Sequence, residues 1–319
     1  NSNSISTPDN KLAVDRFALT NVSYDATLDY NRTFGRGVGV VRPTYFAENS
    51  LWYLDNTHDD GDLRHSSQVG NWVHMEDIKY NNPESAYYGQ NLSYTHTNEK
   101  GEEQILCSDT IRTWFDWPHY KIWSESPEDE AANLNNYQGS GYADFYLYRL
   151  AETYLLRAEA NYYLGKIEEA TADVNAIRKR AKCKILYSKV DIDDIVDERA
   201  RELYMEEWRF TELSRISYSL ALSGKPDNEG KTYDIKKLHE DSFWWHRICK
   251  YNNYYNKPDA PTVKGRKYTM GRHNINWPIP QSAIDANLLG ELSQNPGYDG
   301  YNPSVEKWET WEEAVADEQ

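Results

Sequence analysis

The chain has 319 residues, 39% of them hydrophobic, and its 35 basic and 51 acidic side chains give a formal net charge of −16 at pH 7. This composition is that of a folded protein with a sizeable core. The negative net charge and the lack of a cluster of Lys and Arg exclude nucleic acid as a partner. No apolar run approaches the roughly 18 residues that span a bilayer, and the first residues, NSNSISTPDNKLAVDRF, lack the basic-then-apolar order of a signal peptide.

Residues 1–142 are predicted to be a loop-rich, aromatic part of the chain. Turn dipeptides such as Asp60-Gly61 and Asn82-Pro83 separate short mixed segments, of which RGVGVVRPTYF is predicted to contain a strand. The whole chain holds 26 Tyr and 11 Trp but only 7 Phe. Rings that carry a polar atom suit a hydrated binding surface as well as a core.

Two stretches in this part offer the groups that bind sugars, which are flat aromatic faces beside amides and carboxylates. They are NWVHMEDIKYNNPESAYYGQNLSY and TWFDWPHYKIW, the latter ending in Trp123. Most of their rings are expected to pack inside the protein. The candidates for ligand binding, chosen because polar or turn residues surround them, are Trp72, Tyr88, Asn91, Trp114 and Trp117.

An acidic segment, DNTHDDGD, is the one candidate for a metal. Asp59 and Asp62 could hold calcium through clustered carboxylates, although the spacing is not that of an EF-hand. The alternative is an acidic surface loop or a structural pair between Asp62 and Arg64. No other cofactor is expected, because neither the histidines nor the three widely spaced cysteines have the spacing of zinc ligands.

A helical core is predicted for residues 143–217. Apolar residues recur at helical spacing from Phe145 to Tyr162, Gly165 occupies the position where a left-handed residue ends a helix, and a second stripe runs to Ala181. Small residues at Ala158 and Ala170 would let the two helices approach closely. This spacing is typical of a tetratricopeptide hairpin.

A third helix is predicted from the acidic cluster at residues 191–194 to about Ile216, because acidic residues favour a helix N-terminus. Placed at 100° per residue, one face carries charged side chains among apolar ones. Charges on an apolar face need partners, so we expect a partly buried network that reaches the hairpin through Glu152 or Glu159. Its members on the third helix are Arg199, Glu202, Glu206 and Arg209.

Residues 218–319 are predicted to be a loop-rich C-terminal part. It holds a second aromatic region from Phe243 to Tyr255, a short helix in WPIPQSAIDAN, and a turn in QNPGY. Gly297 supplies the positive φ that a type II turn requires.

Together and in order, these motifs resemble one family. RLAETYLLRAEA, NAIRKRA, DERARELYMEEWRFTEL, WPIP and QNPGY resemble the C-terminal half of SusD/RagB-like proteins, and RGVGVVRPT, DDGDLRHSS and YNNPES resemble the middle of the RagB-like branch. The resemblance covers nearly all of residues 34–301. It implies a mainly α fold with a tetratricopeptide-like helical hairpin core, a large loop-rich region and minor β structure.

The resemblance also implies a function. It indicates a cell-surface protein of the outer membrane that captures oligosaccharide and delivers it to a SusC-like TonB-dependent transporter. The alternatives left open are a peptide ligand, as in the RagB branch, and a tetratricopeptide-type interaction scaffold. An enzyme is not expected, because no GxSxG, HExxH or P-loop occurs and nothing selects two of the 51 acids for a glycosidase.

Two features of the resemblance are expected to be absent from this chain. These are the N-terminal half of the family fold and the lipidated Cys of its membrane anchor. We therefore expect the 145–181 hairpin to show a bare face that carries some of Tyr146, Leu147, Tyr154, Tyr162 and Tyr163.

Overall fold

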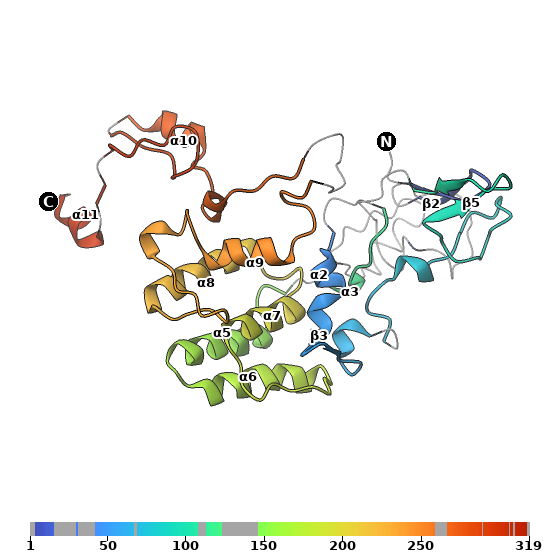
Figure 1. The fold of residues 1–319 in the computed structure, drawn as a ribbon, viewed down its shortest axis with the longest axis horizontal. Coiled ribbons are helices and arrows are strands. Elements are labelled where there is room, and N and C mark those ends of the chain that lie inside the picture. Colours follow the sequence, from blue (N-terminus) through green and yellow to red (C-terminus); the bar gives the residue numbers. More distant parts are fainter. Residues whose placement is uncertain are drawn as a thin grey trace, which may run out of the picture. The chain divides into compact units, whose positions relative to one another are not determined.

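The computed structural model describes residues 4–15, 30, 42–66, 69–107, 113–122, 146–258, 267–288, 290–305, 307–308 and 310–317. Figure 1 shows the chain as a ribbon coloured along the sequence. By its internal contacts the chain divides into two compact units. The first is Asn1–Trp208 with Tyr251–Tyr268, and the second is Arg209–Lys250 with Thr269–Gln319. The strand predicted in RGVGVVRPTYF and the ring of Trp123 lie outside the described residues.

Short strands pair in antiparallel ladders in the first part of the chain. Strand β1 (Ser4–Ser6) pairs with β2 (Leu12–Asp15), β3 (Tyr53–Leu54) with β4 (Thr57–His58), and β5 (Thr95–Thr97) with β6 (Glu103–Ile105). The helical elements of this region are equally short: α2 (Tyr45–Glu48), η2 (Ser50–Trp52), η3 (Leu63–His65), η4 (Met75–Asp77) and α3 (His119–Ile122). This confirms the minor β structure that the sequence predicts.

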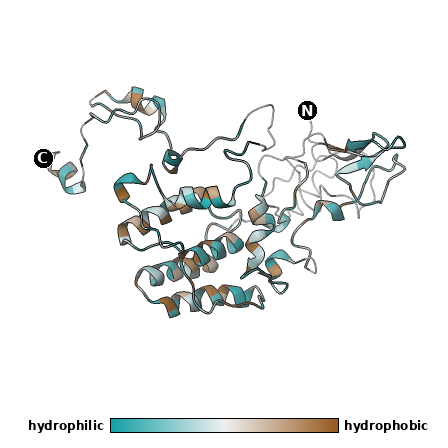
Figure 2. Cartoon of the chain, viewed as in Figure 1, coloured by the Kyte–Doolittle hydropathy of each residue, from teal (hydrophilic) through white to brown (hydrophobic). Residues whose placement is uncertain are grey.

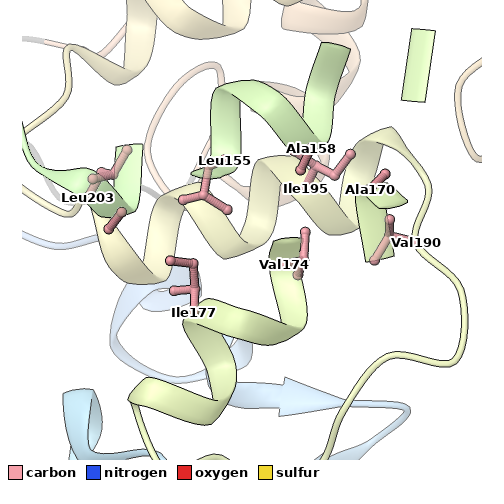
Figure 3. Close-up of a cluster of buried hydrophobic side chains, with 9 residues drawn as sticks. Leu155, Ala158, Ala170, Val174, Ile177, Val190, Ile195 and Leu203 are labelled. Atoms are coloured by element: carbon pink, nitrogen blue, oxygen red, sulfur yellow. The ribbon is translucent and has the colours of Figure 1, made fainter. Parts of the chain in front are cut away.

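The hairpin consists of α5 (Leu150–Tyr163) and α6 (Ile167–Arg180), which pack against each other and are joined through Gly165 at φ +77°. Ala158 and Ala170 are fully buried, as close helix packing requires. Figure 3 shows their side chains meeting Val174 and Ile195 in one cluster. Helix α5 begins at Leu150, five residues later than the periodicity predicts.

The outer face of α5 is apolar only in part. Leu150 and Leu156 on the helix are exposed, as are Tyr146 and Leu147 just before it, whereas Tyr154 and Tyr162 pack against the buried cluster. The predicted bare face is therefore correct for Tyr146 and Leu147 and wrong for Tyr154 and Tyr162. Figure 2 shows hydrophobic and hydrophilic residues alternating along the helices, as expected for amphipathic helices.

The predicted third helix is two helices. Helix α7 (Ile192–Glu202) starts at a capping box in which the Asp191 side chain accepts from the Asp194 backbone N–H, and Leu203 is its C-cap. Met205 then has a φ of +61°, a left-handed conformation that cannot continue an α-helix. Helix α8 (Arg209–Ser223) starts after this break and belongs to the second unit. The prediction of one continuous helix to Ile216 is wrong, because helical periodicity does not register a single left-handed residue.

The second unit is built on α8 and α9 (Phe243–Tyr251). The backbone N–H of Trp244, a fully buried residue, donates to Ser217 Oγ over 2.8 Å, and the ring of Phe210 packs edge-on against it. Short elements complete the unit: η5 (Ile235–Lys237), η6 (Arg272–Ile275), α10 (Gln281–Ala286) and α11 (Trp311–Asp317). The predicted short helix after WPIP is α10, and Gly297 has the predicted positive φ, +92°. No helix in the described ranges is both long and apolar enough to cross a bilayer.

Candidate functional site

A small hydrophobic cluster organises the loop-rich part of the first unit. Its buried residues are Ile5, Val73, Met75, Ile78, Tyr80, Leu92 and Cys107. Around it the chain is held by backbone hydrogen bonds instead of long strands. Leu92 N–H donates to Ile78 O over 2.7 Å, and Gly89 N–H donates to Tyr80 O over 2.8 Å. These bonds close the loop that carries two of the predicted ligand-binding residues.

Tyr88 lies on this loop and is more exposed than the tyrosine beside it. Its neighbour Tyr87 packs on the hydrophobic cluster against Tyr80, with ring centroids 6.3 Å apart, whereas Tyr88 is 38% exposed. Asn91 follows on the same loop, where its backbone pairs with Lys79 and its side chain is exposed. The loop therefore presents one aromatic ring and one amide to solvent, which is the pair of groups that a sugar ring uses.

Trp114 and Trp117 pack on the same cluster and are half-buried. The ring of Trp114 lies edge-on to Tyr94 at 5.6 Å. Trp117 exchanges two backbone hydrogen bonds with Val73, of 2.9 and 3.2 Å, which fix its position. Both rings keep some surface for a ligand, but much of each stabilises the loops.

Trp72 occupies a different place from the other four candidates. It is 4% exposed, its indole N–H donates to Arg64 O over 2.9 Å, and its ring packs edge-on against Trp52. A ring in this position offers no face to a sugar. The sequence assignment of Trp72 to the binding surface is corrected accordingly: it is a core residue in this structure.

The carboxylates of the acidic segment form structural hydrogen bonds within the protein. Asp62 accepts hydrogen bonds from Arg64 at 2.7 and 2.8 Å, and Asp59 accepts from Arg178 at 3.0 Å and from the backbone N–H groups of Lys184 and Ile185. All of these donors compete with a cation for the carboxylate oxygens. Among the described residues no group of three or more side chains is placed to hold a metal. The predicted alternative, a structural pair between Asp62 and Arg64, is what the structure contains.

Glu198 is the centre of an ion-pair network, and it is fully buried. Its carboxylate lies 2.8 Å from Arg64, 3.0 Å from Arg178 and 2.9 Å from Arg201. Burial by itself would raise the pKa of Glu198, but the three arginines lower it to about 2. The network thus joins η3, α6 and α7 through one carboxylate.

Two of the predicted members extend the network. Glu202 pairs with Arg149 at 3.0 Å and with Arg180 at 2.7 Å, and Glu206 pairs with Arg149 at 2.5 Å and with Lys121. The prediction that charges on the third helix connect it to the hairpin is correct for Glu202. Glu206 takes part from the turn that follows α7, because the helix ends before it.

The other predicted members of the network have different positions. Arg199 pairs with Glu207 at 2.8 Å, and Arg209 is the first residue of α8, in the second unit. Glu159 is buried in α5. No ion pair to Glu152 is present in the part of the chain that the structure describes, so the proposed link through Glu152 is wrong.

Sequence reasoning missed the centre of the network, since Glu198, Arg178 and Arg201 were not among its predicted members. A usable signal was present in DERARE, where Glu198 and Glu202 are four residues apart and so share one helix face. Arg178, however, comes from another helix, and periodicity within one helix does not identify it.

A shallow cleft lies where the chain enters α5. Its lining residues are Tyr146, Leu147, Tyr148, Arg149, Glu152, Leu203, Glu206 and Glu207. Tyr148 is 85% exposed at its rim. The cavity measures about 10 Å³, roughly the space that one water molecule needs. It is too small to enclose a sugar ring.

Three histidine rings gather beside Trp52 and Trp72, with His65 in contact with both tryptophans. His65 stacks on Trp52 at 4.5 Å, and its ring lies 6.2 Å from His58 and 6.1 Å from His74. Burial, with the nearby His74 and His58, lowers the pKa of His65 to about 4. The pKa of His74 is raised by its hydrogen bond to Asp116, which measures 2.7 Å. Sequence spacing alone did not reveal that these rings gather.

Comparisons of the chain with known proteins found one family and several similar proteins. The family described as the SusD family matches residues 11–298. A protein of Bacteroides thetaiotaomicron named "Starch-binding protein SusD" is 46% identical over 155 residues, which are 49% of this chain and 22% of that protein. A crystal structure of a SusD superfamily protein from Bacteroides fragilis aligns at a TM-score of 0.38 and 17% identity, over 89% of this chain and 50% of that one. The chain spans half or less of the length of these two relatives.

Proposed function

The chain belongs to the SusD family, and from this we propose that it is a glycan-binding protein of the cell surface. In this proposal it captures an oligosaccharide at the outer membrane and delivers it to a SusC-like TonB-dependent transporter. It binds without cleaving, since SusD-like proteins are binding proteins. The relative that shares 46% identity is named as a starch-binding protein, which supports an α-glucan as the first ligand to test.

One observation on this chain carries the proposal: the loop of residues 80–92 leaves Tyr88 and Asn91 exposed. The adjacent Tyr87 packs inward on the core and holds the loop in place. An exposed ring on a loop whose backbone is already held can stack on the apolar face of a pyranose without the cost of ordering the loop on binding. The amide of Asn91 then supplies both a donor and an acceptor for sugar hydroxyls.

Trp114 and Trp117 would contribute at the edge of this surface. Both pack on the same hydrophobic cluster as the loop, and both keep part of their rings accessible. We name Tyr88, Asn91, Trp114 and Trp117 as the binding surface and leave Trp72 out of it.

Isothermal titration calorimetry of the purified chain with maltooligosaccharides and a panel of other oligosaccharides tests the proposal. We expect saturable, weak binding of at least one saccharide and no change in its length when the mixture is analysed by chromatography. Released sugar would contradict the binding-only role. Binding of short peptides with no saccharide bound would favour the peptide-binding alternative instead.

A further inference from the structure

The second unit exposes one aromatic ring whose backbone is unusually well held. Trp277 is 67% exposed, in the segment between η6 and α10. A single exposed apolar side chain is normal on a protein surface. The surroundings of Trp277 are what set it apart from Trp308, which is 60% exposed on the same unit.

Two amide side chains fix the backbone of this segment. Gln294, which is buried, accepts a hydrogen bond from Ile279 N–H at 2.7 Å and donates to Ile279 O at 2.8 Å. Asn295 Nδ2 donates to the carbonyl of Trp277 itself at 2.7 Å. Pro278, which follows the tryptophan, restricts the chain further. The main chain that carries the indole is therefore preorganised.

The indole itself rests on a second ring. Phe210 of α8 meets Trp277 in an edge-to-face contact, with centroids 5.9 Å apart and planes at 83°. Phe210 is in turn anchored on the buried Trp244, at 4.9 Å. An edge-to-face contact supports the indole while leaving much of its surface to solvent.

Polar groups of the kind that bind hydroxyls flank this segment. Asn276 precedes the tryptophan, and its Oδ1 accepts from the hydroxyl of Tyr218, on α8, at 2.9 Å. Tyr218 is itself 37% exposed. Asn295 uses only one of its amide hydrogens on the Trp277 carbonyl, so its side chain keeps further hydrogen-bonding capacity.

We propose that Trp277 is a second carbohydrate-binding site, at which the exposed indole stacks on one pyranose ring and the amides of Asn276 and Asn295 bind its hydroxyls. This inference rests on the proposed function for the class of its ligand. It goes beyond that function because the site lies in the other compact unit and shares no residue with the Tyr88 surface.

The test uses the full chain, the saccharide that binds most tightly in the calorimetric panel, and three variants. Trp277→Ala removes the platform, Trp308→Ala removes an exposed indole elsewhere on the same unit, and Tyr88→Ala removes the ring of the first site. We expect Trp277→Ala to weaken binding at one class of sites by roughly three- to tenfold, the effect of losing one aromatic stacking contact. Trp308→Ala should leave binding unchanged.

A second measurement is independent of affinity. The indole N–H resonance of Trp277, assigned by its absence from Trp277→Phe, should shift during the titration in the wild-type chain and also in Tyr88→Ala. If the wild-type chain binds saccharide while this resonance stays still and Trp277→Ala binds normally, the second site is refuted and the proposed function stands. If the wild-type chain binds no saccharide, both fail together.

Discussion

Arg178 and Glu198 form a buried ion pair, with Nη1 lying 3.0 Å from Oε2 and both side chains at most 2% exposed. The pair joins α6 to α7, and Arg178 also holds Asp59 of the loop before η3. Removing one partner of such a pair leaves a charge in the interior without compensation. The network therefore stabilises the arrangement of the hairpin, of α7 and of the loop.

Replacing Glu198 by Gln should lower the free energy of unfolding by about 3–5 kcal/mol, because three arginines lose their common carboxylate. Urea denaturation followed by circular dichroism measures the change. Glu229→Gln is the matched control, since Glu229 pairs with Lys250 at 3.1 Å on the surface and should have no measurable effect. Equal effects of the two substitutions would show that the Glu198 network is solvated.

The same carboxylate predicts a pH dependence. A pKa of about 2 in the folded protein, against 4.5 for an ordinary Glu, corresponds to about 3 kcal/mol of stability. Because the pKa is lowered on folding, this stability is fully present above pH 4.5 and is lost as the pH falls towards 2. Between pH 4.5 and pH 3 the wild-type chain should lose stability more steeply than Glu198→Gln does.

His65 predicts a second pH dependence, at higher pH. Its pKa of about 4 in the folded protein lies below the ordinary 6.5, so the unfolded chain takes up the proton first. Stability linked to His65 is thus complete above pH 6.5 and is lost as the pH falls towards 4, by about 2 kcal/mol at pH 5.

The matched variant for this test is His65→Phe, which keeps a ring between Trp52 and Trp72 but cannot titrate. Unfolding free energies at pH 7.5 and pH 5 should differ less in the variant than in the wild type. His74 adds to the pH dependence of the unfolding free energy with the opposite sign, because its pKa is raised in the folded protein. This contribution is present in both the wild type and the variant. An identical pH dependence in the two proteins would mean that His65 is solvated.

Met205 tests the break between α7 and α8. At the φ of +61° found for Met205, alanine is sterically strained and glycine is not. The free energy of unfolding of Met205→Gly should therefore equal that of Met205→Ala or exceed it by up to about 1 kcal/mol. At an exposed position inside α6 the order reverses, and Ala172→Gly should lower stability by about 1 kcal/mol. If Met205→Ala were instead more stable than Met205→Gly, the result would contradict the left-handed conformation of residue 205 and favour the single long helix predicted from the sequence.

Tyr88 tests the binding surface. Tyr88→Ala should weaken oligosaccharide binding at the first site by roughly three- to tenfold while the melting temperature stays within error, because the ring is exposed. Tyr45→Ala removes another exposed ring and should leave binding unchanged. Trp72→Phe should lower stability and preserve binding. If Trp72→Phe lost binding without losing stability, Trp72 would be a residue of the binding surface and its assignment to the core would be wrong.

Local regularities of the sequence identified the hairpin and the turns. The stripe that contains Leu155 and Ala158, the left-handed Gly165 and the turn glycine Gly297 each follow from the chemistry of a few adjacent residues. Family membership also followed from the sequence, because the order of short motifs along the chain is specific even where each motif is not. The acids of α7 indicated that a charged face had to find partners.

Tertiary structure decided which partners those are and which rings remain exposed. Arg178 meets Glu198 from another helix, and Arg64 meets it from η3, more than 130 residues earlier in the chain, so no periodicity within one element could predict either contact. Trp72 and Tyr88 were equivalent in the sequence, both aromatic and both surrounded by polar residues. One is buried against Trp52 and the other faces solvent, because burial depends on what the rest of the chain packs against each ring.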